Sequence, residues 1–150
     1  MNTKELAVLL TALSPILEVR GSIPLGLILG LPWTKVLFLS ILGSSLPVFP
    51  ILWGLTYLTG ILRRVKILDR FISWLFAHTR SKSKLVEELE AVGLAIFIAI
   101  PLPGTGVWTG TVAAYLFGIP WLWAFLAALA GTSLASLAVL GVSLGVIRLW

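Results

Sequence analysis

The chain has no cysteine and little charge. The absence of cysteine excludes disulfide bonds and thiolate metal sites. Charged residues make up only 11% of the 150 residues, whereas 59% are hydrophobic and the mean hydropathy is +1.07. A soluble domain needs a polar surface, and its charged fraction is typically about 25%. The composition therefore predicts an integral membrane protein.

The hydrophobic runs are continuous and do not alternate with polar residues. Strands of a membrane barrel need alternating segments of about ten residues, but AVGLAIFIAI and WLWAFLAALA are apolar throughout. We therefore expect an all-α membrane protein. The single histidine, His78, falls in a polar linker. The sequence contains no metal-ligand cluster, nucleophile–base pair or nucleotide-binding loop, so we expect no enzymatic activity, no metal and no cofactor.

Charge-free stretches mark where the chain can cross a membrane, which takes about 20 apolar residues. Residues 36–62 and 120–147 are long enough, with a kink expected near Pro47 and Pro50. Two breaks rich in proline and glycine, SPILEVRGSIPLG at the start and PLPGTGVWTG at 101–110, are each flanked by short apolar segments. Irregular backbone at membrane depth is tolerated where it is buried in protein or lines a cavity. Each break therefore predicts a re-entrant helical hairpin.

The two halves of the chain match at an offset of 88 residues. GLPW at 30–33 recurs as GIPW at 118–121, and GSSL at 43–46 recurs as GTSL at 131–134. One hairpin and one transmembrane helix per half give an odd number of crossings, so the second half is expected to be inverted. We predict a single membrane domain of two repeats, about 1–60 and about 87–150, joined by a linker over 61–86.

The linker carries most of the positive charge. Lysine and arginine near membrane spans remain on the cytoplasmic side, so the basic stretch between residues 63 and 84 is expected to be cytoplasmic. Residues 61–77 have apolar and basic faces, which predicts an amphipathic helix in the headgroup layer. A linker at the membrane surface explains the positive charge of the chain, so this charge does not indicate nucleic-acid binding. The residues expected at the membrane surface are Arg63, Arg64, Lys66 and Arg70.

Glu18 and Arg20 lie in the first break, in an otherwise uncharged stretch. Ionisable residues at membrane depth are costly and suggest function. An extended segment would point both side chains the same way, into one cavity, with Arg20 attracting an anion and Glu18 binding a proton or a cation. Two alternatives to a functional role remain open: the two charges only neutralise each other, or they lie at headgroup level.

The second break is uncharged but exposes backbone. Its glycines let backbone N–H and C=O groups face a ligand. One half-helix is expected to start near Ser22 and another near Thr109, and both would point their N-termini at the cavity. Helix N-termini favour anions. The predicted substrate and ion site comprises Glu18, Arg20, Ser22, Pro24, Pro103, Gly104, Thr105, Gly106 and Thr109.

LEVRGSIPLGLILGLPW followed by PLPGTGVWTGTVAAYLFGIPW resembles the small multidrug export protein family of prokaryotes. That family is similar, at greater distance, to the DedA (VTT) superfamily, in which two re-entrant hairpins face each other with inverted symmetry. The resemblance implies that Glu18 and Arg20 are the functional acid and base of the first hairpin. It also implies that residues 103–106 form the turn of the second hairpin, and that the chain resides in a prokaryotic plasma membrane. DedA proteins carry arginine in the second hairpin, and this sequence has none there.

The sequence thus predicts a small DedA-like transporter that acts on a membrane lipid or another amphiphile, of the polyprenyl-phosphate or phospholipid class, with ion coupling. Two spans enclose little space, so a homo-oligomer is expected. The first alternative is proton-coupled export of small molecules through Glu18. The second is a membrane interaction or assembly module without transport activity.

Overall fold

The computed structural model describes residues 2–62, 70, 73, 84–100 and 105–149, and this part of the chain is almost entirely helical, without strands. The all-α prediction is therefore confirmed. The helices are α1 (Thr3–Leu13), α2 (Glu18–Ile28), α3 (Trp33–Ser45), α4 (Val48–Leu62), α6 (Lys84–Ala99), α7 (Val107–Phe117) and α8 (Trp121–Leu149).

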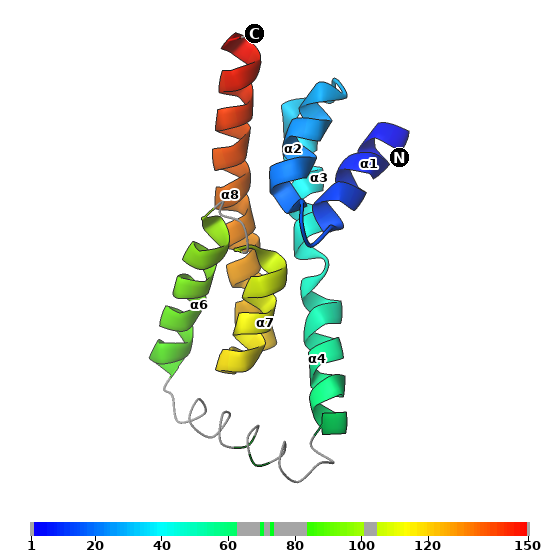
Figure 1. Ribbon diagram of the computed structural model, residues 1–150. Coiled ribbons are helices and arrows are strands. Elements are labelled where there is room, and N and C mark those ends of the chain that lie inside the picture. The colour runs from blue at the N-terminus through cyan, green and yellow to red at the C-terminus, as the bar shows by residue number, and fades with distance from the viewer. Residues whose placement is uncertain (1, 63–69, 71–72, 74–83, 101–104, 150) are drawn as a thin grey trace.

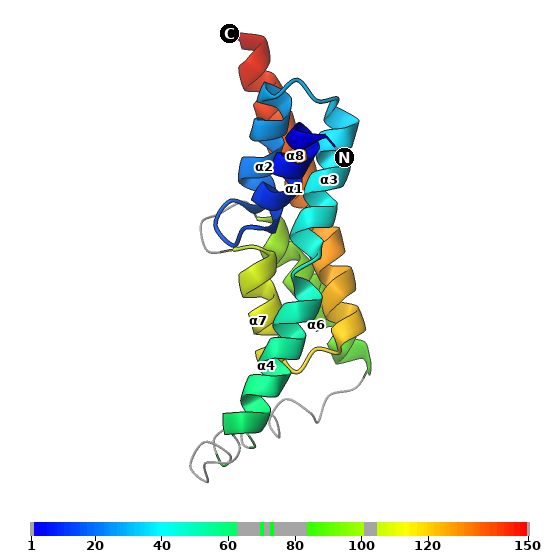
Figure 2. The same ribbon diagram turned by 90° about the vertical axis from the view of Figure 1, so that its right-hand side faces the viewer.

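Two pairs of short helices occupy opposite ends of an elongated molecule (Figure 1). The α1–α2 pair lies at one end beside α3. The α6–α7 pair lies at the other end, with α7 beside α4 and α6 beside α8. The long helix α8 runs past both pairs, and Figure 2 shows the same arrangement from the side. The end of α1 and the start of α7 lie near mid-length, so the two pairs meet there.

The GLPW and GIPW segments form loops of the same geometry. Gly30 and Gly118 both adopt the left-handed conformation, with φ of 76° and 71°, which glycine adopts without strain. The residue after each glycine donates its N–H to the carbonyl five residues earlier, at 3.1 and 2.9 Å, which is the helix-ending pattern of the Schellman motif. Each loop is followed by a proline and then by a tryptophan that begins the next helix, Trp33 or Trp121.

Two segments are long and apolar enough to cross a membrane, Trp33–Ile61 and Trp121–Val146. They correspond to the two predicted spans. The first is interrupted between Ser45 and Val48, so the predicted kink falls at Pro47. Pro50 lies in the first turn of α4, where the missing N–H costs no helical hydrogen bond.

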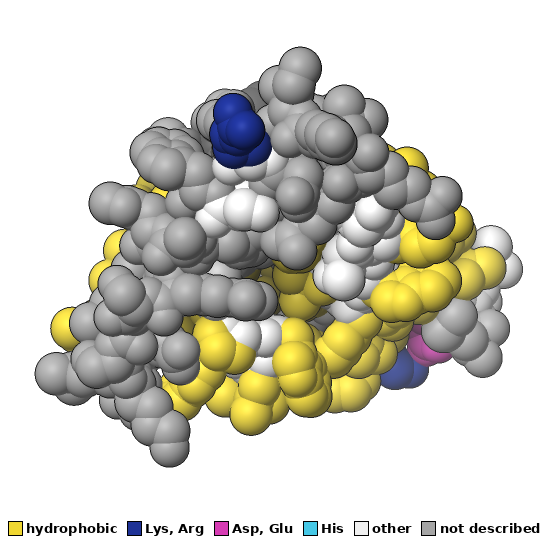
Figure 3. All heavy atoms as spheres, turned by 90° about the horizontal axis from the view of Figure 1, so that it is seen from below, with side chains coloured by type: hydrophobic (Ala, Val, Ile, Leu, Met, Phe, Trp, Pro, Cys, Tyr) yellow, Lys and Arg dark blue, Asp and Glu magenta, His cyan; other side chains and the backbone are white. Residues whose placement is uncertain are grey.

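The surface of the described residues is strongly apolar. Trp53 and Ile28 are each 77% exposed and Phe38 is 66% exposed. Figure 3 shows hydrophobic side chains covering much of the described surface seen from the α4 and α6 end. Soluble monomers rarely expose apolar patches larger than a few hundred Å². The exposed apolar side chains and the two spans together indicate a helical membrane protein.

Small residues let the helices pack closely, as is typical inside membranes. A β-carbon on Gly43 of α3 would lie 2.7 Å from Ala12 Cβ of α1, and one on Gly131 of α8 would lie 2.7 Å from Ile98 Cβ of α6. Neither position has room for a side chain. Gly43 and Gly131 are also 88 residues apart, so α1 packs on α3 much as α6 packs on α8.

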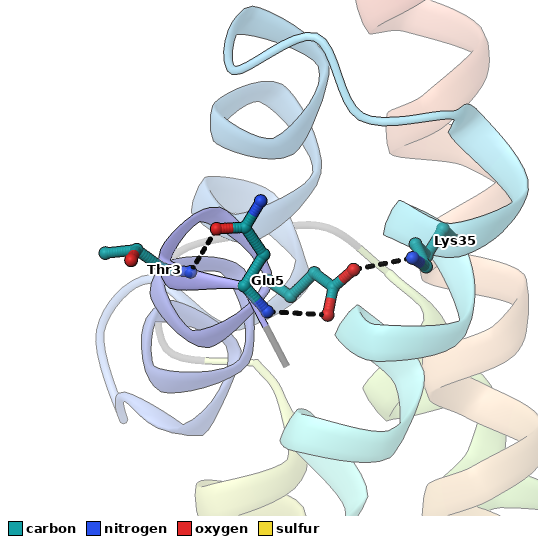
Figure 4. Close-up of polar contacts among 4 residues, drawn as sticks. Thr3, Glu5 and Lys35 are labelled. Carbon is teal, nitrogen blue, oxygen red and sulfur yellow. Dashed lines mark hydrogen bonds and ion pairs between the residues drawn. The ribbon is translucent and has the colours of Figure 1, made fainter.

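Polar contacts tie the start of α1 to α3 (Figure 4). Asn2 and Glu5 form a capping box at the helix start, and the Lys35 ammonium of α3 contacts Glu5 Oε1 at 2.5 Å. The hydrogen bond from Lys35 lowers the pKa of Glu5 below its ordinary value. Lys4 Nζ donates to the Leu29 carbonyl at 2.8 Å, near the end of α2.

Most of the predicted amphipathic helix at 61–77 lies outside the described residues, and so do Arg63, Arg64 and Lys66. Arg70 is described; it is helical and exposed. That Arg70 lies at the membrane surface remains a prediction.

Candidate functional site

A polar cavity of about 240 Å³ lies where the two helix pairs meet. Larger cavities in the described part of the chain are lined almost entirely by apolar side chains. The polar cavity combines residues from both breaks, which are more than 80 positions apart in the sequence. It is lined by Pro15, Ile16, Glu18, Arg20, Thr105, Trp108 and Thr109.

The prediction of an extended segment through Glu18 and Arg20 is wrong. Residues 14–17 form the turn, and α2 already begins at Glu18, four residues before the expected start near Ser22. Glu18 is the one non-glycine residue with positive φ, 43°, among those described. This strained conformation turns its side chain away from the direction that a regular helix would give it. Both charged side chains therefore line one cavity although both are helical.

The Glu18 carboxylate lies against the start of α7, and the residue as a whole is only 7% exposed. Its Oε1 accepts a hydrogen bond from the Trp108 N–H at 3.4 Å. A β-carbon at Gly106 would lie 2.7 Å from Oε1 and 2.8 Å from the carboxyl carbon, and closer still to Oε2. Only glycine at position 106 lets the carboxylate approach. The N-terminus of α7, which begins at Val107 rather than near Thr109, stabilises this negative charge.

The Arg20 guanidinium lies against the end of α6. Its Nη2 donates to the Thr105 hydroxyl at 3.0 Å, to the Ile100 carbonyl at 3.3 Å and to the Thr105 carbonyl. The Thr105 hydroxyl in turn donates to the Ile100 carbonyl at 2.5 Å. Carbonyl groups at a helix C-terminus carry partial negative charge. The end of α6 thus compensates the positive charge of Arg20, and the start of α7 compensates the negative charge of Glu18.

Glu18 and Arg20 do not form an ion pair within 4 Å. Among the described residues, Lys35–Glu5 is the one such pair. Each charged group instead contacts the second break. Their contacts hold the two helix pairs together at mid-length. The geometry therefore differs from the simple self-neutralising pair considered from the sequence.

Trp108 is a site residue that the sequence prediction left out. Its indole Nε1 donates to the carbonyl of Leu13, the last residue of α1, at 3.3 Å, and its ring lines the cavity. Trp108 lies 88 residues after Arg20, so the repeat offset pointed to it. Tryptophan is not ionisable, so in the sequence only the repeat offset pointed to Trp108.

The remaining predicted residues divide into three groups. Thr109 lines the cavity, and its hydroxyl donates to the Gly106 carbonyl at 3.3 Å. Ser22 does not reach the cavity; it is fully buried and donates to the Ser40 hydroxyl at 2.7 Å. Pro24 is a half-buried residue inside α2 and is not among the cavity residues. Pro103 and Gly104 lie outside the described residues.

The model of a protein family described as "Putative small multi-drug export protein" matches residues 18–138. The chain belongs to this family. The match includes the helices from α2 to α7, the first part of α8 and every cavity residue except Pro15 and Ile16, and it leaves out α1. No curated protein and no solved structure matches the chain. The family match confirms the resemblance found in the sequence. The family description and the apolar helices both indicate a membrane protein.

Proposed function

We propose that the chain is a small inverted-repeat transporter whose two helix pairs are re-entrant hairpins entering from opposite membrane surfaces. The repeat offset supports this: α3 and α8 begin 88 residues apart, and α2 and α7 begin within one residue of that offset. The two pairs lie at opposite ends of the molecule (Figure 1). Hairpins that meet at mid-depth around a cavity are a recurrent transporter construction.

The contacts between the hairpin tips support a two-fold relation. In a two-fold interface, residue i contacts residue j of the partner and the equivalents contact each other in return. Arg20 donates to the Ile100 carbonyl just after α6. Its equivalent, Trp108, donates to the Leu13 carbonyl at the end of α1, one residue after the equivalent of Ile100. Glu18 faces Gly106, which is its own equivalent, as expected for a residue on the axis.

The proposed substrate is an amphiphile with an anionic headgroup, of the phospholipid or polyprenyl-phosphate class. The cavity offers a guanidinium and the hydroxyls of Thr105 and Thr109 for the headgroup, and an indole for the apolar part. Arginine binds phosphate well because its planar group can donate two parallel hydrogen bonds. Glu18 is the proposed binding site for the coupling ion, since it is the one carboxylate lining this cavity.

The observation that carries the proposal is this cavity, which joins an acid and a base from one hairpin to the tip of the other. Two membrane-spanning segments enclose little space by themselves, so we also propose that the transporter is a homo-oligomer. The basic linker would face the cytoplasm by the positive-inside rule.

A second candidate is proton-driven export of cationic small molecules. The family description and the buried carboxylate of Glu18 favour it. Arg20 separates the two candidates, because its positive charge attracts an anionic headgroup and repels a cation. A membrane interaction module without transport activity is the third candidate.

Replacing Arg20 by alanine is expected to lower flux of anionic lipid by about tenfold or more, since a hydrogen bond to a charged group contributes about 1.5–3 kcal/mol. Flux is measured in reconstituted vesicles with a fluorescent phospholipid and, separately, with an aromatic cation. Ser133→Ala is the control, because Ser133 bonds only to its own helix, at Leu129. Faster cation export by Arg20→Ala would support the second candidate, and unchanged flux of both substrates would contradict a transport role for the cavity.

A further inference from the structure

Three buried hydroxyl groups between the long helices have no hydrogen-bond partner among the described residues. They belong to Ser45 of α3 and to Thr132 and Ser136 of α8, which are at most 4% exposed. A buried polar group without a hydrogen-bond partner destabilises the fold. Such groups in native proteins are usually bonded to ordered water when no protein atom serves.

Other hydroxyls in the described helices avoid this cost by bonding to the backbone of their own helix. Side chains of serine and threonine in membrane helices commonly donate to the carbonyl four residues earlier. Because Ser45, Thr132 and Ser136 do not form this bond, their hydroxyls remain available across the helix interface. The residues that do form it, at 2.6–2.8 Å, are Thr11, Thr56, Thr59, Thr111 and Ser133.

Ser45 belongs to α3, Thr132 and Ser136 belong to α8, and these two helices are in contact. At one end of this contact Phe49 packs on Phe125, with ring centroids 4.9 Å apart. Ser45 and Leu129 line the same groove one turn further along. Leu129, Thr132 and Ser136 are spaced three and four residues apart and therefore share one face of α8.

The same contact continues toward Glu18. Val36 of α3, Ala135 of α8 and Val19 of α2, the residue next to Glu18, belong to one buried apolar cluster. Ser22 lies one helical turn after Glu18 in α2. Its hydroxyl donates to the Ser40 hydroxyl of α3 at 2.7 Å, and both residues are fully buried. Hydroxyls thus extend from the neighbourhood of Glu18 across α3 to α8, in the half of the molecule where these helices adjoin (Figures 1 and 2).

We propose that these hydroxyls, which we call the hydroxyl seam, bind ordered water that gives protons access to Glu18. The proposal rests on the proposed function, in which Glu18 binds the coupling ion. A proton passes between water molecules and hydroxyls and binds the Glu18 carboxylate, and it leaves later through the cavity; no other bond changes. The hydroxyl seam consists of Ser22, Ser40, Ser45, Thr132 and Ser136.

Few other charges can compete for such a proton. Arg20 is the one other charged residue at the Glu18 end of the seam. Lys4, Glu5 and Lys35 lie at the far end of the α1–α3 group. Helix α8 has no charged residue between positions 121 and 147. Glu18 is therefore the carboxylate that the seam would serve.

The chain has no cysteine, so single cysteines report directly on water in the seam. Ser136→Cys and Thr132→Cys are close in size to the native residues. A thiol reacts as the thiolate, which forms slowly in apolar surroundings. We expect both cysteines to react with a small hydrophilic methanethiosulfonate, in vesicles containing the intact protein, at least about tenfold faster than Ala135→Cys, because one unit of thiol pKa changes the thiolate fraction tenfold.

Ala135 is the matched control because it is 2% exposed and packs in the apolar cluster beside the seam. Labelling after denaturation shows that each thiol is present, and unchanged tryptophan fluorescence melting shows that each variant is folded. Equal reaction rates at positions 132, 135 and 136 would overturn the proposal.

A second measurement tests the proton role. Thr132→Val keeps the shape of the side chain but removes its hydroxyl, and we expect it to slow proton-coupled transport severalfold, with Thr132→Ser restoring the rate. Fast labelling together with normal transport by Thr132→Val and by Ser22→Ala would overturn proton access. If the seam is labelled but Glu18→Gln transports normally, the water site stands and the proposed function of Glu18 fails.

Discussion

Glu18→Gln is expected to stop coupled transport while the protein remains folded in the membrane. Glutamine has nearly the same shape and can still accept the hydrogen bond from the Trp108 N–H, but it can neither bind a proton nor attract a cation. A charged group in such a site contributes about 1.5–3 kcal/mol, which corresponds to at least about tenfold in rate. The measurement is flux in reconstituted vesicles with and without a pH gradient.

Glu18→Asp separates the charge from its position. Aspartate keeps the charge but withdraws it by one methylene from the N-terminus of α7, so we expect intermediate activity. Ser133→Ala should transport normally, because Ser133 is bonded only within α8. Gradient-dependent transport by Glu18→Gln at the normal rate would contradict the assignment of Glu18 as the ion site.

Gly106→Ala is expected to separate the two hairpin tips. The added methyl group would lie 2.7 Å from Glu18 Oε1 and 2.8 Å from the carboxyl carbon, closer than any ordinary contact. The carboxylate is buried and held by Trp108, so it has little room to move. Overpacking of this kind costs about 1–3 kcal/mol. We expect a lower melting temperature in detergent, followed by tryptophan fluorescence, and a loss of transport.

A double-mutant cycle shows whether Glu18 causes the effect. Without the carboxylate the methyl group has space, so adding Gly106→Ala to Glu18→Ala should cost far less stability than Gly106→Ala alone. Gly141→Ala is the matched control, because a β-carbon there has nothing within 4 Å. Gly106→Ala with the melting temperature of Gly141→Ala would contradict the close approach of the two hairpins.

Much of the fold follows from local signals in the sequence. The long apolar runs predict the spans that begin at Trp33 and Trp121, and the repeated GLPW and GIPW segments predict two equivalent loops. These features depend on residues near each other in the chain. Proline and glycine also predict an interruption before α2, and the structure has it as the turn at 14–17.

The candidate site was harder to predict because its contacts join distant residues. Glu18 and Arg20 are two positions apart, which suggests that they pair with each other, yet their partners are 80–90 residues away. The start of α2 was misplaced because Pro24 was interpreted as part of the break. The structure keeps it inside the helix, where the turn at 14–17 already supplies the reversal. Ser22 was assigned to the cavity by proximity in sequence, but the helical turn directs it toward Ser40.

The central claim is that two hairpins enter the membrane from opposite surfaces and meet at Glu18. Thr34 and Leu122 test it most directly, because they lie 88 residues apart, are exposed and follow the two equivalent loops. Single cysteines at these positions are labelled with a membrane-impermeant maleimide in right-side-out and inside-out vesicles. The account predicts that Thr34→Cys is labelled in one orientation and Leu122→Cys in the other. Labelling of both cysteines from the same side would contradict it.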